Sequence, residues 1–485
     1  MTPPFFLGID VGTQGARVVL IDANGEQAGE VGETFKLDKQ SLQEQSPAEW
    51  WHACLRSLKA LIAQTKNTVD PHTIIAVSVT STSGTVIPLN ALNEPLHNAI
   101  MYSDKRSVKE GELCTQKALQ FHNSGYTSFN SSSGLSKIVW FAHTFPLEAQ
   151  KIGKWIHAAD FIIGKLSDNW GITDYTNALK SGYDLDKNEW PEYLYTELPL
   201  QKEWLPEVVP SGTPIGTLKP GIAAEIGLNM QVQVVAGMTD GCASQIASGA
   251  VKVGDWNTTI GTTLVIKGVT VNEIKDPQGR LYNHRHPEGY WMPGGASNIG
   301  ADWVTQDFNE DLNVLNEKAF ELIPTNKLSY PLRQQGERFP FIAPGARGFE
   351  EEGLSKEESF AANMEGVAFI ERYAYEMIEK LSGEKVAAVY SAGGASNSGT
   401  WLTIRSNVMN LPVYKMKHIT GAVGAAILAA SKTYFSSVTE ATRALTQVET
   451  AVQPDKVLAE KYNKIYNRFL QVLLNKGYIK NEGYA

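Results

Sequence analysis

The sequence has few cysteines, no long apolar run and no basic run, and each absence excludes a class of protein. Its three cysteines among 485 residues, Cys54, Cys114 and Cys242, are odd in number and far apart, so we expect neither a disulfide framework nor a Cys-x-x-Cys zinc site. No apolar run approaches the ~20 residues that cross a bilayer. The net charge is -9, which argues against nucleic acid as the main partner. With no signal-peptide pattern, we expect a cytoplasmic protein without a membrane partner.

Familiar phosphate-binding motifs are also missing. The chain contains no G-x-x-x-x-G-K-[ST] loop and no G-x-G-x-x-G after a strand. The His-Arg-Asp and Asp-Phe-Gly signatures of protein kinases are absent too. A nucleotide site in this chain must therefore be built in another way. The length of 485 residues and the hydrophobic content of 42% favour two or three domains with sizeable cores.

What the sequence does contain is a turn rich in glycine and threonine near its start. The stretch Asp10-Val11-Gly12-Thr13-Gln14-Gly15-Ala16-Arg17 lies between two apolar runs, which predicts a strand, a tight turn and a second strand. Turns of this kind expose backbone N–H groups that can cradle phosphate oxygens. An Asp at the end of the first strand, here Asp10, can hold a magnesium ion, usually through water. The alternative is an ordinary hairpin with glycines in the turn.

A second copy of this layout begins about half a chain later, at residues 255–267. There a β-branched strand runs into Gly261-Thr262-Thr263, and an apolar strand follows. Internal repetition indicates duplicated architecture. Two phosphate-binding hairpins on duplicated domains are typical of the ATP site of actin and of sugar kinases.

The remaining pattern predicts alternating strands and helices. We expect a strand meander over residues 5–35, further strands over 74–79, 231–236 and 386–390, a hairpin over 255–270, and helices over 47–65, 108–119, 135–143, 241–250, 359–381 and 421–430. Mixed strands and helices in two similar halves indicate an α/β protein. We place the domain boundary at the Gly237-Met238-Thr239-Asp240 junction, which gives domains 1–236 and 237–485.

Asp240 is the candidate catalytic base. It follows an apolar strand and stands at the start of a helix. Transfer of a phosphoryl group from ATP to a hydroxyl needs a carboxylate that accepts the hydroxyl proton. The alternative is an Asp that only caps the helix N-terminus. The two hairpins favour the catalytic role.

Three other segments carry candidate binding residues, each with a plain structural alternative. Gly393 and Gly394, in a strand-to-turn segment ending at Asn397, would let a flat base approach the backbone, or they form an ordinary strand–helix turn. Asp104 and Arg106 follow an apolar strand and could bind sugar hydroxyls, or form a solvated charged turn. The hydroxyl-rich loop from Thr80 to Thr85, with Ser83 and Gly84, could line a polyol pocket, or act as a polar connector.

Taken in order along nearly the whole chain, these motifs resemble those of the FGGY family of carbohydrate kinases. The corresponding segments are Asp10-x-Gly12-Thr13, Tyr102-x-Asp104-x-Arg106, Lys137-x-x-Trp140, Gly237-Met238-Thr239-Asp240, Ile260-Gly261-Thr262-Thr263, Ala362-x-Met364-x-Gly366-Val367, and Gly393-Gly394-Ala395 with Gly421-Ala422-x-Gly424-Ala425-Ala426. The resemblance implies an α/β fold with two actin-like (ribonuclease H-like) ATPase domains flanking a cleft.

The resemblance also implies an ATP- and Mg2+-dependent kinase with a small-molecule sugar substrate, working as a monomer or homodimer. It assigns the sugar to Ser83, Gly84, Asp104, Arg106 and Asp240, the nucleotide to Thr13, Gln14, Arg17, Gly261, Thr262, Gly393, Gly394 and Asn397, and the metal to Asp10. In this assignment Asp240 deprotonates a terminal sugar hydroxyl, and Thr13 and Thr262 donate hydrogen bonds to phosphate oxygens.

Departures from the family pattern bear on the substrate. Thr82-Ser83-Gly84-Thr85-Val86 is similar to the T-S-G-T-V loop of D-ribulose kinases, whereas xylulokinases typically carry Gln-Met-His-Gly. Ser81 replaces the Asp that precedes this loop in those relatives, and Gly348 follows Arg347 where a Pro is usual. We therefore expect a ketopentose, D-ribulose first, with D-xylulose, L-ribulose, a pentitol and glycerol left open.

Two hypotheses from other classes share these features. An actin-like ATPase would keep both hairpins and hydrolyse ATP without sugar. A catalytically silent sugar sensor would keep the pocket and lack turnover, but the intact Asp240 and both hairpins argue against it.

Overall fold

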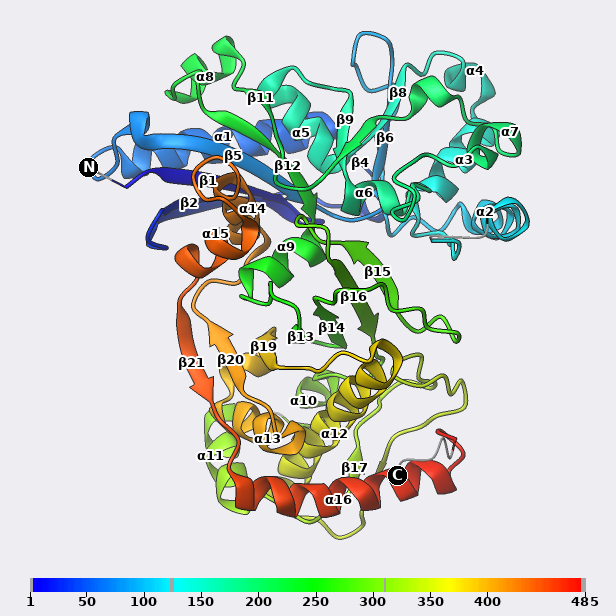
Figure 1. Ribbon diagram of the computed structural model, residues 1–485, viewed down its shortest axis with the longest axis vertical. Helices are drawn as coiled ribbons and strands as arrows, with labels where there is room; N and C mark the ends of the chain where they lie inside the picture. Colours follow the sequence, from blue (N-terminus) through cyan, green and yellow to red (C-terminus); the bar gives the residue numbers. More distant parts are fainter. Residues whose placement is uncertain (1–2, 123–125, 309–310, 481–485) are drawn as a thin grey trace. The chain divides into compact units, whose positions relative to one another are not determined.

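The chain forms two compact units in a computed structural model that describes residues 3–122, 126–308 and 311–480 (Figure 1). Unit 1 comprises Met1–Ala247, His284–Gly289 and His418–Gln447. Unit 2 comprises Ser248–Asn283, Tyr290–Lys417 and Val448–Ala485. The chain thus returns to unit 1 late in the sequence. The predicted domains 1–236 and 237–485 do not include such a return. Both units mix helices and strands.

Unit 1 is built on a six-stranded sheet with the order β11-β12-β5-β1-β2-β3. Its strands are β1 Phe5–Val11, β2 Gly15–Asp22, β3 Gln27–Thr34, β5 Ile74–Ser81, β11 Pro214–Thr217 and β12 Gln233–Thr239. β1, β5 and β12 run parallel to one another, whereas β2 and β3 continue from β1 as an antiparallel meander. The predicted meander and the strand over 74–79 are therefore confirmed, and β12 continues to Thr239, past its predicted end.

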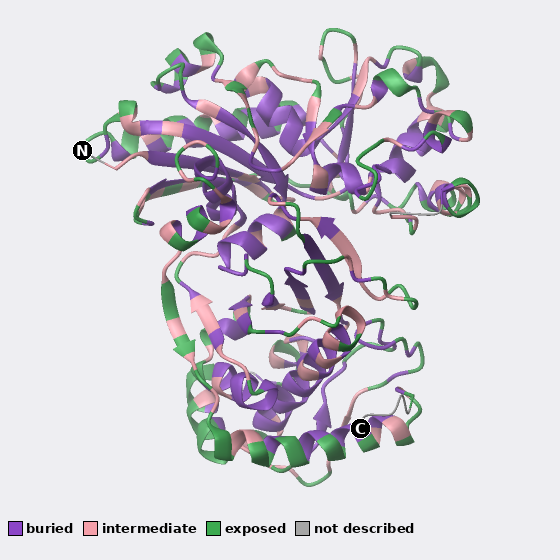
Figure 2. Ribbon diagram, viewed as in Figure 1, coloured by how far each residue is buried: buried purple, intermediate pink, exposed green. Residues whose placement is uncertain are grey.

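Two helices pack their apolar residues against this sheet. α1 (Pro47–Thr65) has the predicted bounds, begins at the N-cap Ser46 and packs on β2 and β3. α14 (Gly421–Ala430) packs on β1 and β5, and all of its residues are buried (Figure 2). Its backbone comes so close that a Cβ atom on Gly8 would lie 1.8 Å from the Ala422 carbonyl oxygen. Gly8 therefore permits the contact between this helix and the sheet.

The rest of unit 1 consists of a smaller sheet with the order β4-β7-β6-β8, short strands and further helices. Their bounds are β4 Glu44–Gln45, β6 Val86–Leu89, β7 Ala99–Ile100, β8 Lys154–His157, β9 Ile172–Asp174, β10 Glu207–Val209, α2 Val108–Phe121, α3 Gly134–Thr144, α4 Pro146–Ala149, α5 Ala158–Ser167, α6 Tyr175–Leu179, α7 Tyr193–Thr196, α8 Pro220–Ile226, α9 Asp240–Ala247 and α15 Val438–Leu445. The predicted helices over 108–119, 135–143 and 241–250 correspond to α2, α3 and α9.

The second mixed sheet, on which unit 2 is built, has seven strands in the order β15-β16-β14-β13-β19-β20-β21, with β15 at Tyr282–Arg285. The other strands are β13 Asp255–Ile260, β14 Leu264–Gly268, β16 Trp291–Ala296, β19 Ala388–Ala392, β20 Val413–Met416 and β21 Val448–Val452. β13 and β14 form the predicted hairpin, and β19 runs parallel to β13. The central strands are largely buried (Figure 2).

The helices of unit 2 pack into one hydrophobic core with this sheet. They are α10 Asp302–Asp307, α11 Leu312–Leu322, α12 Lys356–Ser382, α13 Gly399–Met409 and α16 Lys456–Asn475. The short strands β17 Ser329–Tyr330 and β18 Phe349–Glu350 form a separate antiparallel pair. α12 begins before its predicted start because Ser355 and Glu358 form a capping box, and it ends at Gly383 in the left-handed conformation. Within the described ranges, no helix is both long and apolar enough to cross a membrane.

Candidate active site

The three parallel strands of unit 1 end together, and two candidate carboxylates lie at this edge. In the register of the sheet Asp10 is opposite Thr80, while Ser81 is opposite both Val11 and Thr239. Asp240 follows Thr239 directly and begins α9. The carboxyl ends of parallel strands meet at one edge of a sheet, and this edge is a common place for ligand sites in α/β proteins. The structure therefore brings Asp10 and Asp240 to the same edge of the sheet.

The electrostatics of Asp10 reflect this arrangement. Burial, and after it the negative charge of Asp240, raise the pKa of Asp10 to about 7, while the charge of Arg17 acts in the opposite direction. The Oδ1 atom of Asp10 is buried and has no hydrogen-bond partner. A Cβ atom on Gly421 would lie 2.8 Å from the other carboxylate oxygen. Asp10 therefore has a carboxylate oxygen that is available to a ligand.

These residues fit a magnesium ion that is held mostly by water and substrate. Mg2+ prefers oxygen ligands, usually keeps several waters and is bound by one or two carboxylates together with phosphates. Asp10 supplies an unpartnered oxygen, and Asp240 supplies a second negative charge near it. Among the described residues there is no group of three or more His, Cys, Asp or Glu that could hold a metal alone. In such a site the protein supplies one or two ligands, and water and phosphate supply the others.

The first Gly/Thr turn joins β1 to β2 beside Asp10. Its backbone is held by Gly12 N–H, which donates to the Gly15 carbonyl at 3.0 Å, and by Gln45, whose side chain donates to the Thr13 carbonyl at 3.0 Å. The Gln14 side chain is exposed. Arg17 is opposite Asp10 across the hairpin and pairs with Glu30 at 3.3 Å.

Asp104 and Arg106, the two candidate sugar ligands after the apolar strand, form an ion pair with each other. Two nitrogens of the guanidinium donate to Asp104 Oδ2 at 2.9 and 2.7 Å, and the guanidinium also reaches Glu44 at 2.7 Å. It lies over the ring of Trp140, 4.3 Å from the ring centre. Asp104 is 1% exposed. The two hydrogen bonds from the guanidinium hold its carboxylate in one orientation. Glu44 is a partner that the sequence reasoning missed.

Lys137 is a buried cation whose charge interacts with that of Asp104. Its ammonium donates to the Ser131 carbonyl oxygen, and burial lowers its pKa to about 7, opposed by the charge of Asp104 and reinforced by that of Lys180. In the sequence, Lys137 stands out only as part of the K-x-x-W segment. Its burial is the property that local sequence did not reveal.

The hydroxyl-rich loop after β5 is held in one conformation. Gly84 has φ +79°, and a Cβ atom there would lie 2.2 Å from the Ser132 carbonyl oxygen, so a side chain is excluded. Thr85 accepts a hydrogen bond from the Tyr102 N–H at 3.2 Å, which ties the loop to the segment that carries Asp104. The Ser83 hydroxyl is buried and has no hydrogen-bond partner. Buried hydroxyls are normally partnered, so Ser83 is a candidate to bind a ligand.

In unit 2 the second Gly/Thr turn meets the Gly-Gly segment. Gly393 has φ +81°, and a Cβ atom there would lie 2.4 Å from the Ile260 carbonyl oxygen. No atom lies within 4 Å of the Cβ positions of Gly261 and Gly394. Thr262 is backed by Gly300, whose Cβ position would be 2.3 Å from its carbonyl oxygen. Two predicted nucleotide segments are therefore adjacent, with open space over the backbone of both.

A cavity of about 540 Å3 adjoins this region and is lined by Asn397. The other lining residues come from α11 and from the start of α13: Asn313, Asn316, Glu317, Phe320, Glu321, Ser398, Gly399 and Thr400. Asn397 accepts a hydrogen bond from Lys415 at 3.1 Å. The lining combines polar side chains with the aromatic ring of Phe320.

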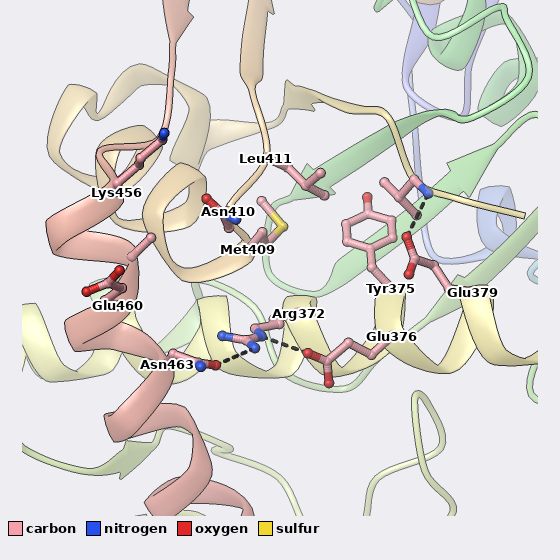
Figure 3. A pocket seen from close by; sticks show the side chains of 12 residues that line it. Arg372, Tyr375, Glu376, Glu379, Met409, Asn410, Leu411, Lys456, Glu460 and Asn463 are labelled. Carbon is pink, nitrogen blue, oxygen red and sulfur yellow. Dashed lines mark hydrogen bonds and ion pairs between the residues drawn. The ribbon is translucent and has the colours of Figure 1, made fainter. Parts of the chain in front are cut away.

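A second cavity in unit 2, of about 550 Å3, contains none of the predicted residues (Figure 3). Arg372 stands at its centre and donates to Glu376 and to Asn463, both at 2.8 Å. The guanidinium also lies over the Tyr466 ring, 4.0 Å from its centre. The charge of Arg372 is therefore already paired with Glu376 within the fold.

Comparison with known proteins decides what kind of protein carries these two sets of residues. Residues 5–247 match the N-terminal domain of the FGGY family of carbohydrate kinases, and residues 256–433 match its C-terminal domain. The chain belongs to the FGGY family of carbohydrate kinases. The predicted family, and with it the enzyme class, a phosphotransferase that uses ATP, are confirmed.

Individual FGGY relatives span almost the whole chain. The xylulose kinase of Bacillus subtilis is 26% identical over 96% of both chains. The gluconokinase of Bacillus licheniformis is 26% identical over 87% of this chain and 86% of its own. The crystal structure of xylulose kinase from Rhodospirillum rubrum superimposes with a TM-score of 0.84 at 22% identity, covering 97% of this chain and 98% of that one. The likeness confirms the predicted actin-like α/β fold.

Proposed function

We propose that this FGGY kinase transfers the γ-phosphate of ATP to a terminal hydroxyl of a ketopentose, with D-ribulose as the first candidate and D-xylulose as the alternative. The observation that carries the proposal is the meeting of Asp10 and Asp240 at the end of β1 and β12, with the buried and unpartnered Ser83 in the loop after β5. The D-ribulose choice is supported by the Thr82-Ser83-Gly84-Thr85-Val86 loop. The D-xylulose alternative is supported by relatives named xylulose kinase.

The sugar is bound by residues of unit 1. Asp104, held by Arg106, accepts hydrogen bonds from sugar hydroxyls, because its position is fixed before the sugar arrives. Ser83 donates to or accepts from another hydroxyl, and Gly84 keeps its loop close to the sugar. In this assignment Arg106 contributes chiefly by orienting Asp104. Such prearranged hydrogen bonds are the source of selectivity among polyols.

The nucleotide is bound by Thr13, Gln14 and Arg17 from the first turn and, in unit 2, by Gly261, Thr262, Gly393, Gly394 and Asn397. The open space over Gly261 and Gly394 suits phosphates that approach the backbone N–H groups. Thr13 and Thr262 donate hydroxyl hydrogens to phosphate oxygens. Asp10 would hold Mg2+, and the ion would supply positive charge that neutralises the phosphate oxygens.

Asp240 carries out the proton transfer. Its carboxylate accepts the proton of the terminal hydroxyl while the hydroxyl oxygen forms a bond to the γ-phosphorus. The bond between that phosphorus and the bridging oxygen breaks in the same displacement, and ADP leaves with the bonding electrons. A base that is positioned in this way contributes about 10²–10⁴-fold to the rate.

We also propose that the enzyme acts in the cytoplasm, as a monomer or homodimer. Its cysteines, Cys54, Cys114 and Cys242, are buried and unbridged, which suits a reducing compartment. Light scattering on the purified protein would decide between monomer and dimer.

The test is coupled measurement of ADP release with Mg-ATP and D-ribulose, D-xylulose, L-ribulose, ribitol, xylitol, gluconate or glycerol, together with a control lacking sugar. We expect one ketopentose to give a kcat/KM at least ~10-fold above the others. ADP release that is the same without sugar would overturn the proposal in favour of an actin-like ATPase. Preference for gluconate or glycerol would overturn the ketopentose assignment while leaving a sugar kinase.

A further inference from the structure

One peptide group, the bond between Met238 and Thr239, is gripped by side chains at both of its polar atoms. The Thr80 hydroxyl donates to the Met238 carbonyl oxygen at 2.8 Å. The Thr239 N–H donates to the Thr176 hydroxyl oxygen at 2.8 Å. Both threonines are 0% exposed. This peptide stands directly before Asp240, so the two hydroxyls form a clamp on the backbone that carries the candidate base.

An irregularity in the strand pairing explains why side chains hold the Met238–Thr239 peptide. The pairing of β12 with β5 shifts register between Val235 and Met238. Within that interval a Cβ atom on Gly237 would lie 1.7 Å from the Val79 carbonyl oxygen, so the two backbones approach unusually closely. A register shift of this kind disrupts the regular ladder and redirects the residues that follow it. The Thr80–Thr176 clamp fixes the backbone just after this irregular stretch.

The Thr176 hydroxyl is itself oriented by a buried carboxylate. It donates its hydrogen to Asp174 Oδ1 at 2.6 Å. Asp174 is 1% exposed and also accepts hydrogen bonds from Asn177 Nδ2 at 2.6 Å and from the Ser211 hydroxyl at 3.2 Å. Because a hydroxyl has one hydrogen and Asp174 takes it, the oxygen lone pairs of Thr176 remain for the Thr239 N–H. Asp174 therefore fixes the direction in which Thr176 acts.

The position of Thr80 links the clamp to the other candidate carboxylate. On one side Thr80 is opposite Asp10 in the β1–β5 pairing, and on the other side it is opposite Met238 in the β5–β12 pairing. Its hydroxyl is used on the β12 side. The residue that lies between the strands of Asp10 and Asp240 thus ties one of those strands in place.

We propose that Thr80 and Thr176 are positioning residues for phosphoryl transfer, which hold the Met238–Thr239 peptide so that the Asp240 carboxylate faces the sugar hydroxyl. The inference rests on the proposed role of Asp240 as the base. The clamp touches neither sugar nor nucleotide in this arrangement. Its loss therefore lowers kcat and leaves both KM values nearly unchanged, since displacement of a reacting group by about 1 Å can cost ~10²-fold in rate.

The test compares Thr176→Val and Thr80→Val, which remove a hydroxyl at nearly constant volume, with Thr176→Ser and Thr80→Ser, which keep it. We expect each Val variant to lose about 10- to 100-fold in kcat, with KM for sugar and ATP within about 2-fold of wild type. Each Ser variant should recover to within about 3-fold. The double Val variant should lose less than the product of the single losses, because both hydroxyls hold one peptide.

The matched control is Thr65→Val. Thr65 is a buried threonine of unit 1 whose hydroxyl also donates to a backbone carbonyl, that of Leu61, at 2.9 Å. It lies on α1, outside the proposed site, and this substitution should leave kcat within about 2-fold of wild type. Thermal melting of every variant reports stability separately. Should a Val variant fail to fold, the corresponding Ala variant replaces it in the same assay.

Two results separate failure of the clamp from failure of the proposed function. If Asp240→Asn is inactive but both Val variants keep wild-type kcat, the clamp is overturned while the base assignment stands. If Asp240→Asn keeps activity within about 2-fold, the proposed base is wrong and the clamp has no role in catalysis. A third result would also overturn the proposal. If the Val and Ser variants at one position lose the same amount of kcat and show the same fall in melting temperature, the threonine has only a structural role.

Discussion

The buried carboxyl group of Glu365 should make the stability of unit 2 depend on pH. Glu365 lies on α12 and is 0% exposed. It accepts hydrogen bonds from the Thr325 N–H at 3.0 Å, from the Tyr462 hydroxyl at 2.9 Å and from the Thr325 hydroxyl. Burial raises its pKa from 4.5 to about 7, because the hydrogen bonds only partly offset the loss of solvation. A Gln side chain has the same shape and stays neutral at every pH.

The sign of the effect follows from proton binding. Between pH 4.5 and about 7 the folded state keeps the Glu365 proton while the unfolded state has released it. The stabilisation is therefore complete below pH 4.5 and is lost as the pH rises to about 7. A tenfold change in proton affinity is worth about 1.4 kcal/mol, which gives a loss of about 2–3 kcal/mol between pH 5 and pH 8. For a unit of this size that corresponds to roughly 5–10 °C in melting temperature.

The assay is differential scanning calorimetry of wild type and Glu365→Gln in parallel at pH 5 and pH 8, with the transition of unit 2 followed separately. We expect the melting temperature of the variant relative to wild type to rise by roughly 5–10 °C from pH 5 to pH 8. Glu352→Gln, at an exposed position of the same unit, is the matched control and should show the same difference at both pH values. A difference for Glu365→Gln that does not change with pH would refute the reasoning.

Two further substitutions test other parts of the structure. Arg405→Met leaves the fully buried Glu371 without its guanidinium partner, which donates to both carboxylate oxygens at 2.7 Å. It should destabilise unit 2 by about 3–5 kcal/mol in urea unfolding, and most of this loss should be regained in Arg405→Met/Glu371→Met. If the double variant is no more stable than the single one, the pair is not the cause. Gly261→Ala places a methyl group where no atom lies within 4 Å, so the melting temperature should be unchanged while KM for ATP rises about 10-fold, since phosphate must approach this backbone. An unchanged KM would remove Gly261 from the nucleotide site.

The sequence predicted those parts of the fold that depend on local pattern. The spacing of apolar residues over 47–65 predicted α1, and the repeated Gly/Thr turns predicted the hairpins β1–β2 and β13–β14. The uniformly small and apolar segment 421–430 predicted a packed helix, and α14 is buried throughout. In each case burial of an apolar face or a turn preference acts within a few residues, so it is visible in the sequence.

The sequence predicted less of the contacts between distant segments. The sequence did not predict that the guanidinium of Arg106 contacts Asp104, Glu44 and the ring of Trp140. The grip of Thr176 on Thr239 joins residues 63 positions apart. Neither follows from spacing, because such contacts are set by how the strands and helices pack. The return of residues 418–447 to unit 1 likewise depends on the packing of α14 against Gly8.

The central claim, that Asp240 accepts the proton of a sugar hydroxyl during phosphoryl transfer, is tested most directly by comparing wild type with Asp240→Asn. Formation of sugar phosphate from Mg-ATP and the preferred ketopentose would be followed by phosphorus NMR, with nucleotide binding measured by calorimetry. The account predicts that wild type forms sugar phosphate and that kcat of the variant falls about 10²–10⁴-fold, while its affinity for ATP changes little. Turnover of Asp240→Asn close to wild type would contradict it.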